Sequence, residues 1–124
     1  MAEELILIVD DNAQNRKLAR DVLQFAGFRT LEADGGVEGV AAAVEHLPDL
    51  VLMDIRMPDM NGTEALRQLK DNERTAKIPI VALTSSTMLG DQERFLGDGF
   101  DGYLRKPISV REFPDQVRGH LRQP

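Results

Sequence analysis

The sequence predicts an α/β domain in which a doubly wound, five-stranded parallel sheet lies between two layers of helices. Short runs of Leu, Ile and Val alternate along the chain with stretches in which apolar residues recur at helical spacing. The apolar runs are continuous, which is typical of strands covered on both faces. Parallel strands need crossover connections, and the helical stretches between the runs supply them.

Five strands are expected, and each ends where polar or turn-forming residues begin. After the third strand come Asp54, then Pro58 and the pair Asn61-Gly62, which make the chain leave the strand direction and reverse. We place the strands at Leu5–Val9, Arg29–Ala33, Leu50–Leu52, Ile80–Leu83 and Tyr103–Arg105.

A helix is expected after each of the first two strands. Asp11 or Asn12 can cap the first helix, and Gly27 is placed to end it. Helical spacing predicts that the buried face of this helix consists of Leu18, Val22, Phe25 and Ala26. The same spacing predicts that the apolar face of the second helix consists of Val37, Val40, Ala41, Val44 and Leu47.

Three more helices are expected in the second half of the chain. The apolar face of the third consists of Ala65, Leu66 and Leu69. Gly90 interrupts the fourth, so we expect a mobile element there, with Met88, Gln92, Phe95 and Leu96 on one face. Ser109 and Glu112 have the spacing of a capping box for the fifth. Pro114 and Gly119 lie inside that helix and predict that it begins late, kinks or frays.

Composition limits the classes of protein that need to be considered. With 124 residues, 42% hydrophobic and 29% charged, the chain suits one soluble globular domain. The net charge of -6 argues against direct binding to nucleic acid, which needs a basic face. No stretch approaches the roughly 18 apolar residues that span a bilayer, so we expect a cytoplasmic protein without membrane insertion. The lack of Cys excludes disulfides and thiolate metal sites.

The residues at the strand ends carry the functional signal. The first strand ends at Asp10-Asp11, the third at Asp54, the fourth at Thr84 and the fifth at Lys106. In a parallel sheet these ends share one edge, and in open α/β sheets that edge is where ligands bind. Three carboxylates, one hydroxyl and one ammonium group are therefore expected to meet in a shallow pocket.

Crowded carboxylates repel one another, so their ionised forms need a cation. Mg²⁺ suits the site because it takes one or two protein carboxylates and keeps waters and a phosphate oxygen. Asp54 can then act as a nucleophile toward phosphorus, with the metal and Lys106 neutralising the oxygens of the acyl phosphate. Thr84 is placed to hydrogen-bond the new phosphoryl group.

Taken together and in order, four motifs resemble the CheY-like receiver domain of bacterial response regulators. They are Ile6–Asp11, Met53–Pro58, Leu83-Thr84 and Lys106-Pro107. The resemblance covers essentially the whole chain. It implies a flavodoxin-like three-layer sandwich with strand order 2-1-3-4-5, and residues 1–124 as a single receiver domain without an output domain. A receiver excised from a larger hybrid kinase or regulator is the alternative.

The resemblance also implies a role for each residue of the pocket. Asp54 is the phosphoacceptor, and it receives its phosphoryl group from the phosphohistidine of a sensor histidine kinase or a histidine phosphotransfer protein. Asp11 and Asp54 bind Mg²⁺ through carboxylates and Arg56 through its backbone carbonyl, while Asp10 helps through water. Lys106 is the basic partner. Arg56 stands near the acceptor, and we expect it to slow dephosphorylation.

A conformational switch is implied as well. Phosphate on Asp54 would draw Thr84 inward while Tyr103 moves between outward and inward positions, and the Lys106-Pro107 bond is expected to be cis. The surface formed by the fourth helix, fifth strand and fifth helix would then bind a protein target. The chain is expected to be a monomer or a weak phosphorylation-dependent dimer, and not an enzyme beyond its own phosphorylation and dephosphorylation.

Two other classes share parts of this pattern. A flavodoxin-type FMN carrier has the same architecture, but it needs a phosphate-cradling loop after the first strand, where Asp10-Asp11 would repel phosphate. A phosphohydrolase with an Asp nucleophile is expected to carry a second Asp two residues after it, where this chain has Arg56.

Overall fold

The computed structural model of the chain describes residues 3–84 and 97–121. Its centre is a five-stranded sheet with the order β2-β1-β3-β4-β5. All four neighbouring pairs are parallel, as the sequence predicts. The strands are β1 (Leu5–Val9), β2 (Arg29–Ala33), β3 (Leu50–Asp54), β4 (Ile80–Thr84) and β5 (Gly102–Arg105).

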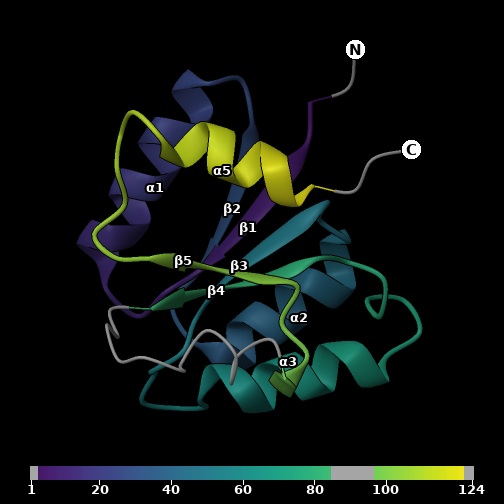
Figure 1. The fold of residues 1–124 in the computed structure, drawn as a ribbon. Helices are drawn as coiled ribbons and strands as arrows, with labels where there is room; N and C mark the ends of the chain where they lie inside the picture. Colours follow the sequence, from purple (N-terminus) through teal and green to yellow (C-terminus); the bar gives the residue numbers. More distant parts are fainter. Residues whose placement is uncertain (1–2, 85–96, 122–124) are drawn as a thin grey trace.

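Helices cover both faces of the sheet and complete the three layers (Figure 1). In the described ranges they are α1 (Ala13–Phe25), α2 (Gly36–His46), α3 (Gly62–Asp71) and α5 (Phe113–His120). Helices α1 and α5 share one apolar cluster with the sheet, and α2 and α3 share another on the opposite face. The expected fourth helix with Met88, Gln92, Phe95 and Leu96 lies outside the described residues. No helix in the ranges 3–84 and 97–121 is both long and apolar enough to cross a membrane.

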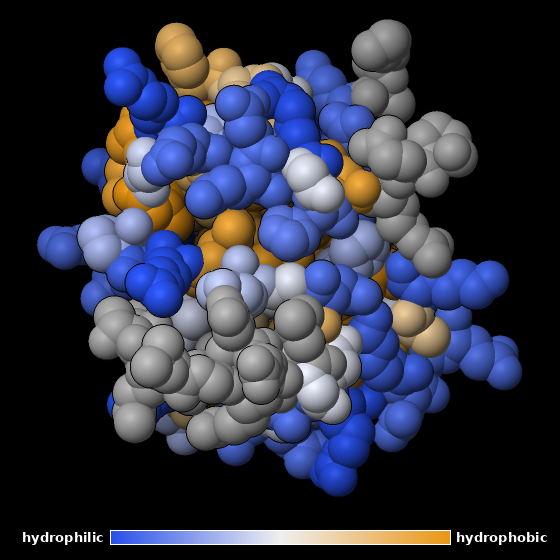
Figure 2. Space-filling view, in the orientation of Figure 1, coloured by the Kyte–Doolittle hydropathy of each residue, from blue (hydrophilic) through white to orange (hydrophobic). Residues whose placement is uncertain are grey.

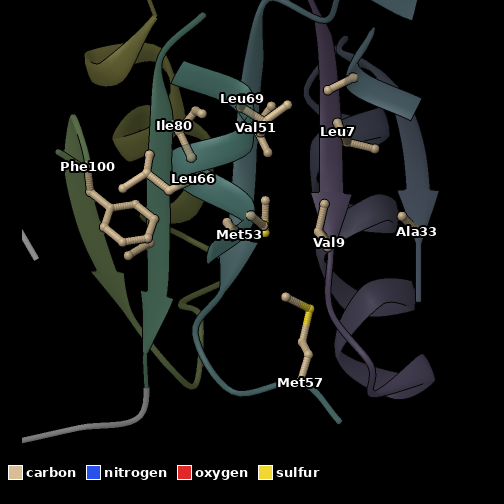
Figure 3. Packing of buried hydrophobic residues seen from close by; sticks show 13 residues of the cluster. Leu7, Val9, Ala33, Val51, Met53, Met57, Leu66, Leu69, Ile80 and Phe100 are labelled. Carbon is tan, nitrogen blue, oxygen red and sulfur yellow. The ribbon is translucent and has the colours of Figure 1, made fainter. Parts of the chain in front are cut away.

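The apolar runs of the sequence become the core because both faces of the sheet are covered. Along β1, Ile6 and Ile8 pack toward α1 and α5. Leu7 and Val9 pack toward α2 and α3 (Figure 3). All four are essentially without exposed surface. Burial of one such side chain contributes about 1.5 to 3 kcal/mol, so the central strands are fixed firmly. The outer face in Figure 2 is mostly hydrophilic, with smaller apolar areas.

The predicted buried face of α1 is wrong in part. Phe25 is 96% exposed and Leu18 is 40% exposed, while Ala19 and Leu23 are buried. Val22 and Ala26 are partly buried, as expected for the predicted face. The buried face is thus shifted around the helix from the expected one, and it presents the small side chain of Ala19 to the sheet.

Helix α2 also turns another face to the sheet than the Val spacing predicts. Val37, Ala41 and Leu47 are exposed, whereas Gly36, Gly39 and Ala43 are buried. The reason is the short distance between α2 and β1, because a Cβ atom at Gly39 would lie 2.8 Å from Cγ1 of Val9. Only small residues fit at that distance, so side-chain size and not hydrophobicity decides which face is buried. Val40 and Val44 lie at the margin of the contact.

The late start predicted for the last helix is confirmed. The Oγ atom of Ser109 accepts a hydrogen bond from the backbone N–H of Glu112 at 3.3 Å, but the helix itself begins at Phe113. Pro114 then lies in the first turn, where its missing N–H costs little. Pro114, which would weaken the interior of a helix, therefore helps to define where α5 begins.

Candidate functional site

The carboxyl ends of the four strands that carry the polar residues lie side by side. Val9, directly before Asp10, pairs with Met53 in β3, and Asp54 pairs with Leu83 in β4. Thr84 pairs with Arg105 in β5. Asp10, Asp54, Thr84 and Lys106 are therefore brought to one edge of the sheet, in the arrangement that the strand ends of the sequence predict.

Lys106 joins two of the carboxylates. Its Nζ atom lies 2.9 Å from Oδ2 of Asp10 and 3.2 Å from Oδ1 of Asp54. Asp10 is 1% exposed and Asp54 is 7% exposed. Removing such groups from water is costly unless each has a partner, and one ammonium group here serves two carboxylates. The pair of buried carboxylates thus retains a net negative charge.

Asp10 is held from several sides. Its backbone N–H donates to the carbonyl of Ala33, and its Oδ1 atom accepts from the N–H of Asn12 at 2.9 Å. Its carbonyl accepts from Nη1 of Arg16 at 2.7 Å. The same guanidinium lies 3.4 Å from Oε1 of Glu32 in β2. The turn that carries the Asp10-Asp11 pair is therefore braced by the first turn of α1 and by β2.

Asp10, Asp11 and Asp54 form an acidic cluster in which one oxygen from each residue lies within 4.8 Å of the others. Asp11 is exposed, so the cluster opens to solvent on that side. Hard divalent cations with oxygen ligands suit this donor set, and Mg²⁺ suits an open site that keeps several waters. The residues present therefore fit the Mg²⁺ site that the sequence predicts.

The electrostatics of the cluster are reflected in two pKa shifts. Burial raises the pKa of Asp54 from 3.8 to about 6, and the charge of Asp10 adds to the shift while Lys106 opposes it. Burial lowers the pKa of Lys106, but its hydrogen bond to Asp10 and the charge of Asp54 outweigh burial and raise it. A further cation beside Asp54 would favour its ionised form.

A loop made of residues 55–61 follows Asp54 and forms one wall of the site. The N–H of Gly62 donates to the carbonyl of Ile55 at 2.8 Å, and Asn61 caps α3 by accepting from the N–H of Glu64 at 2.9 Å. A Cβ atom at Gly62 would lie 2.6 Å from the carbonyl oxygen of Asp54. Glycine is therefore required for the chain to turn so closely behind Asp54.

An open cleft of about 550 Å³ lies beside this loop. Arg56, which is exposed, contributes to it, and so does Asp11 from the opposite side of the site. The other residues around the cleft are Ile55, Met57, Pro58, Asn61 and Thr63. The cleft therefore opens to solvent beside Asp11, the exposed member of the acidic cluster.

Thr84 and Tyr103 occupy different places relative to the cluster. Thr84 is buried at the end of β4, and its carbonyl accepts from the N–H of Lys106 at 2.8 Å. Tyr103 lies within β5 opposite Ala82, is partly buried, and packs against the apolar cluster on the α2 and α3 face. The peptide bond between Lys106 and Pro107 is cis, as the resemblance implies.

Two residues near the site were missed at the level of sequence. Arg16 is a cation near the start of the helix that follows Asp10-Asp11. This position is only a weak indication that its side chain contacts the turn that carries the two carboxylates. Asp59 lies in the turn after Asp54 and makes its contacts with residues 22 and 23 positions away. No local spacing points to such a contact, so only the tertiary structure reveals it.

The fold and the site have counterparts in known proteins. The family model described as "Response regulator receiver domain" matches residues 6–118. The polar-differentiation response regulator DivK of Brucella ovis is 41% identical over 116 residues, which cover 94% of this chain and 94% of that protein.

Similar structures have also been solved. The chemotaxis protein CheY4 of Vibrio cholerae has a TM-score of 0.90 and 28% identity, with coverage of 97% of this chain and 100% of that chain. The receiver domain of the sensor histidine kinase PA1611 of Pseudomonas aeruginosa has a TM-score of 0.86 and 32% identity, with coverage of 96% and 98%. The latter structure has a magnesium ion coordinated in its active site cleft.

Proposed function

This chain belongs to the response regulator receiver domain family and is a phosphorylation-dependent signalling switch, and we propose that Asp54 is its phosphoacceptor. The observation that carries the assignment is the contact of Lys106 with the buried carboxylates of Asp54 and Asp10 at one open edge of the sheet. A carboxylate whose charge is disfavoured by burial is reactive toward an electrophile. The same site provides positive charge for the oxygens that arrive with it.

The phosphoryl transfer uses groups that the site supplies. A carboxylate oxygen of Asp54 forms a bond to phosphorus while the bond from phosphorus to the donor imidazole nitrogen breaks. That nitrogen keeps the electron pair, and the imidazole leaves as a neutral ring because its other nitrogen already carries a proton. Lys106 then contacts a phosphoryl oxygen in place of the carboxylate oxygen it contacts now. Its pKa is raised above the ordinary Lys value, so it stays charged throughout.

We further propose that Asp11, Asp54 and the backbone carbonyl of Arg56 hold Mg²⁺, with Asp10 acting through water. When bound, the ion neutralises the carboxylates and the developing charge on the phosphoryl oxygens. The structure of the PA1611 receiver domain, with magnesium in its active site cleft, supports this assignment. The open side of the acidic cluster at Asp11 leaves room for waters and for the phosphoryl group.

The signal passes from Asp54 to the surface through Thr84 and Tyr103. The hydroxyl of Thr84 binds the new phosphoryl group, and Tyr103 changes between outward and inward positions. A new dianionic group makes contacts that differ between two conformations, and this difference shifts their populations. The surface that responds includes β5 and α5 together with the fourth helix predicted from the sequence, and it binds a protein target.

The donor is the phosphohistidine of a sensor histidine kinase or a histidine phosphotransfer protein. Incubation of the chain with such a phosphorylated donor and Mg²⁺ is expected to transfer one labile phosphoryl group per chain. Replacement of Asp54 by Asn, or chelation of Mg²⁺, abolishes the transfer. Transfer that persists in Asp54→Asn overturns the assignment, and sustained turnover of a phosphomonoester would favour a phosphohydrolase instead.

A further inference from the structure

Asp59 connects the loop after the acceptor to a helix that precedes it in the chain. Its Oδ1 atom accepts a hydrogen bond from the N–H of Gly36 at 3.0 Å, and its Oδ2 atom accepts one from the N–H of Val37 at 3.0 Å. Both donors belong to the first turn of α2. The N-cap position of α2 is Gly35, which offers no side chain for this purpose. A residue of the loop 55–61 therefore caps α2 in place of a local residue.

The amino end of α2 is shaped to admit this loop. A Cβ atom at Gly35 would lie 2.8 Å from Oδ1 of Asp59, and a Cβ atom at Gly36 would lie 2.8 Å from Cβ of Met60. Any larger residue at these positions would therefore push the loop away. The two hydrogen bonds that the Asp59 carboxylate accepts are charge-assisted as well, because the amino end of a helix favours an anion.

The same helix is seated on the strand that carries the other half of the site. Gly39 allows α2 to approach Val9 so closely that a Cβ atom would lie 2.8 Å from a methyl group of Val9. Val9 directly precedes the Asp10-Asp11 pair. Helix α2 thus contacts β1 at Val9, directly before the acidic pair, and the loop 55–61 at Asp59. The end of β1 and this loop are the two walls of the site.

From these contacts we propose that Asp59 is a positioning residue for phosphoryl transfer. It fixes the exposed tip of the loop 55–61 to α2 and thereby sets the distance between the Arg56 carbonyl and the carboxylates that follow β1. The hydrogen bond from the N–H of Gly62 to the carbonyl of Ile55 holds the two ends of the loop together, and Met57 within the loop is buried. Asp59 fixes the part between Met57 and Gly62.

This inference deepens the proposed function and rests on its assignment of Arg56 and Asp11 to the metal site. Asp59 is exposed, and its side-chain hydrogen bonds with Gly36 and Val37 join it to the backbone of α2 rather than to the acidic cluster. It therefore acts through the position of the loop. The rival interpretation is a cap that stabilises α2 and has no effect on the site.

Three variants separate the two interpretations. Asp59→Ala removes both hydrogen bonds, Asp59→Asn retains one acceptor oxygen, and Gly36→Ala displaces the loop from the side of α2. Asp49→Ala is the matched control, because Oδ2 of Asp49 accepts from the N–H of Leu5 at 2.7 Å at the opposite edge of the sheet. Urea unfolding is measured for each variant, together with Mg²⁺ affinity by calorimetry and amide hydrogen exchange at residues 36 and 37.

Asp59→Ala is expected to weaken Mg²⁺ binding about tenfold, as loss of a group that orients metal ligands ordinarily does. The Mg²⁺ affinity of Asp59→Asn is expected to lie between those of Asp59→Ala and wild type. Gly36→Ala is also expected to weaken Mg²⁺ binding. Asp49→Ala loses stability but keeps the wild-type Mg²⁺ affinity. Faster amide exchange at residues 36 and 37 in the two Asp59 variants accompanies the loss.

Wild-type Mg²⁺ affinity in folded Asp59→Ala and Asp59→Asn would overturn the proposal and leave Asp59 as a cap of α2. If Asp59→Ala does not fold, Asp59→Asn and Gly36→Ala decide the matter by the same comparison. The measurement is independent of the phosphoacceptor assignment, because Mg²⁺ affinity needs no phosphoryl donor. A wild-type chain that takes no phosphoryl group would contradict the proposed function while the Mg²⁺ comparison still tests the role of Asp59.

Discussion

The two edges of the sheet use carboxylates in opposite ways. At the amino edge, Asp101 accepts from the N–H of Ile80 at 2.8 Å and pairs with Lys70 at 3.1 Å. This carboxylate therefore has a backbone donor and a cation of its own. At the carboxyl edge, Asp10 and Asp54 are more deeply buried and share Lys106. The amino edge satisfies its charges for stability, whereas the carboxyl edge leaves negative charge in excess for a ligand to neutralise.

Removal of Lys106 tests the shared cation and has the largest expected effect. Lys106→Met leaves the two carboxylates without an ammonium group and removes positive charge from the incoming phosphoryl oxygens. We expect the rate of phosphorylation to fall about 100-fold, the usual result when one charge-stabilising donor is lost. Lys70→Met at the amino edge serves as the control, and its phosphorylation rate is expected to equal that of wild type. Equal rates in Lys106→Met and wild type would remove Lys106 from the reaction.

The stability difference between the edges is tested by Asp54→Asn. Because the pKa of Asp54 is raised to about 6, the protonated acid stabilises the fold below pH 3.8 and this contribution is lost as the pH rises through 6. Asn lacks the charge, so the variant is expected to be more stable than wild type at pH 7.5 by up to about 3 kcal/mol.

Urea unfolding in the presence of a chelator measures this difference. At pH 5 the gain is expected to shrink by about half, since much of the wild-type carboxyl is then protonated in the folded protein. A variant that is less stable than wild type at pH 7.5 would show that Asp54 does not strain the fold.

The amino edge is tested by Asp101→Ala. The change leaves the buried N–H of Ile80 without its side-chain acceptor and Lys70 without its carboxylate. We expect a loss of about 1 to 2 kcal/mol in the free energy of unfolding. Phosphorylation of Asp54 is expected to proceed at the wild-type rate, and a large decrease in that rate would show that the two edges are not separate in function.

Arg56 sharpens the comparison because it adds a second cation to the edge at which two carboxylates share Lys106. It is exposed beside the open cleft, where it can shield the acyl phosphate from water or add positive charge. Arg56→Asn is expected to shorten the phosphoryl half-life roughly threefold, since exposed charges contribute only about 0.2 to 1 kcal/mol. The decrease of protein-bound phosphate over time gives the half-life, and an unchanged or longer value in the variant would contradict this role.

The sheet and the residues at its carboxyl edge could be predicted from the sequence because both follow from short-range pattern. Continuous apolar runs indicate buried parallel strands, and parallel strands bring Asp10, Asp54 and Lys106 to one edge whatever the details of packing. The family resemblance added the role of each residue. The late start of α5 was also predictable, because Pro114 suits a first turn.

The faces of α1 and α2 and the contacts of Asp59 could not be predicted in this way. Apolar spacing predicts that Val37 rather than Gly39 is buried. Gly39 is buried because α2 lies against Val9 at a distance that excludes a side chain. Close packing depends on residue size across elements, which one segment does not encode. The hydrogen bonds from Gly36 and Val37 to Asp59 likewise join segments whose proximity only the folded sheet creates.

The most direct test is to locate the phosphoryl group on the chain. After reaction with a phosphohistidine donor and Mg²⁺, trapping of the acyl phosphate and peptide mass spectrometry should find one modified residue, Asp54. Asp49→Asn should be modified like wild type, and Asp54→Asn should not be modified. Modification at another residue in wild type, or undiminished modification in Asp54→Asn, would contradict the role of the carboxyl edge as the site of phosphorylation.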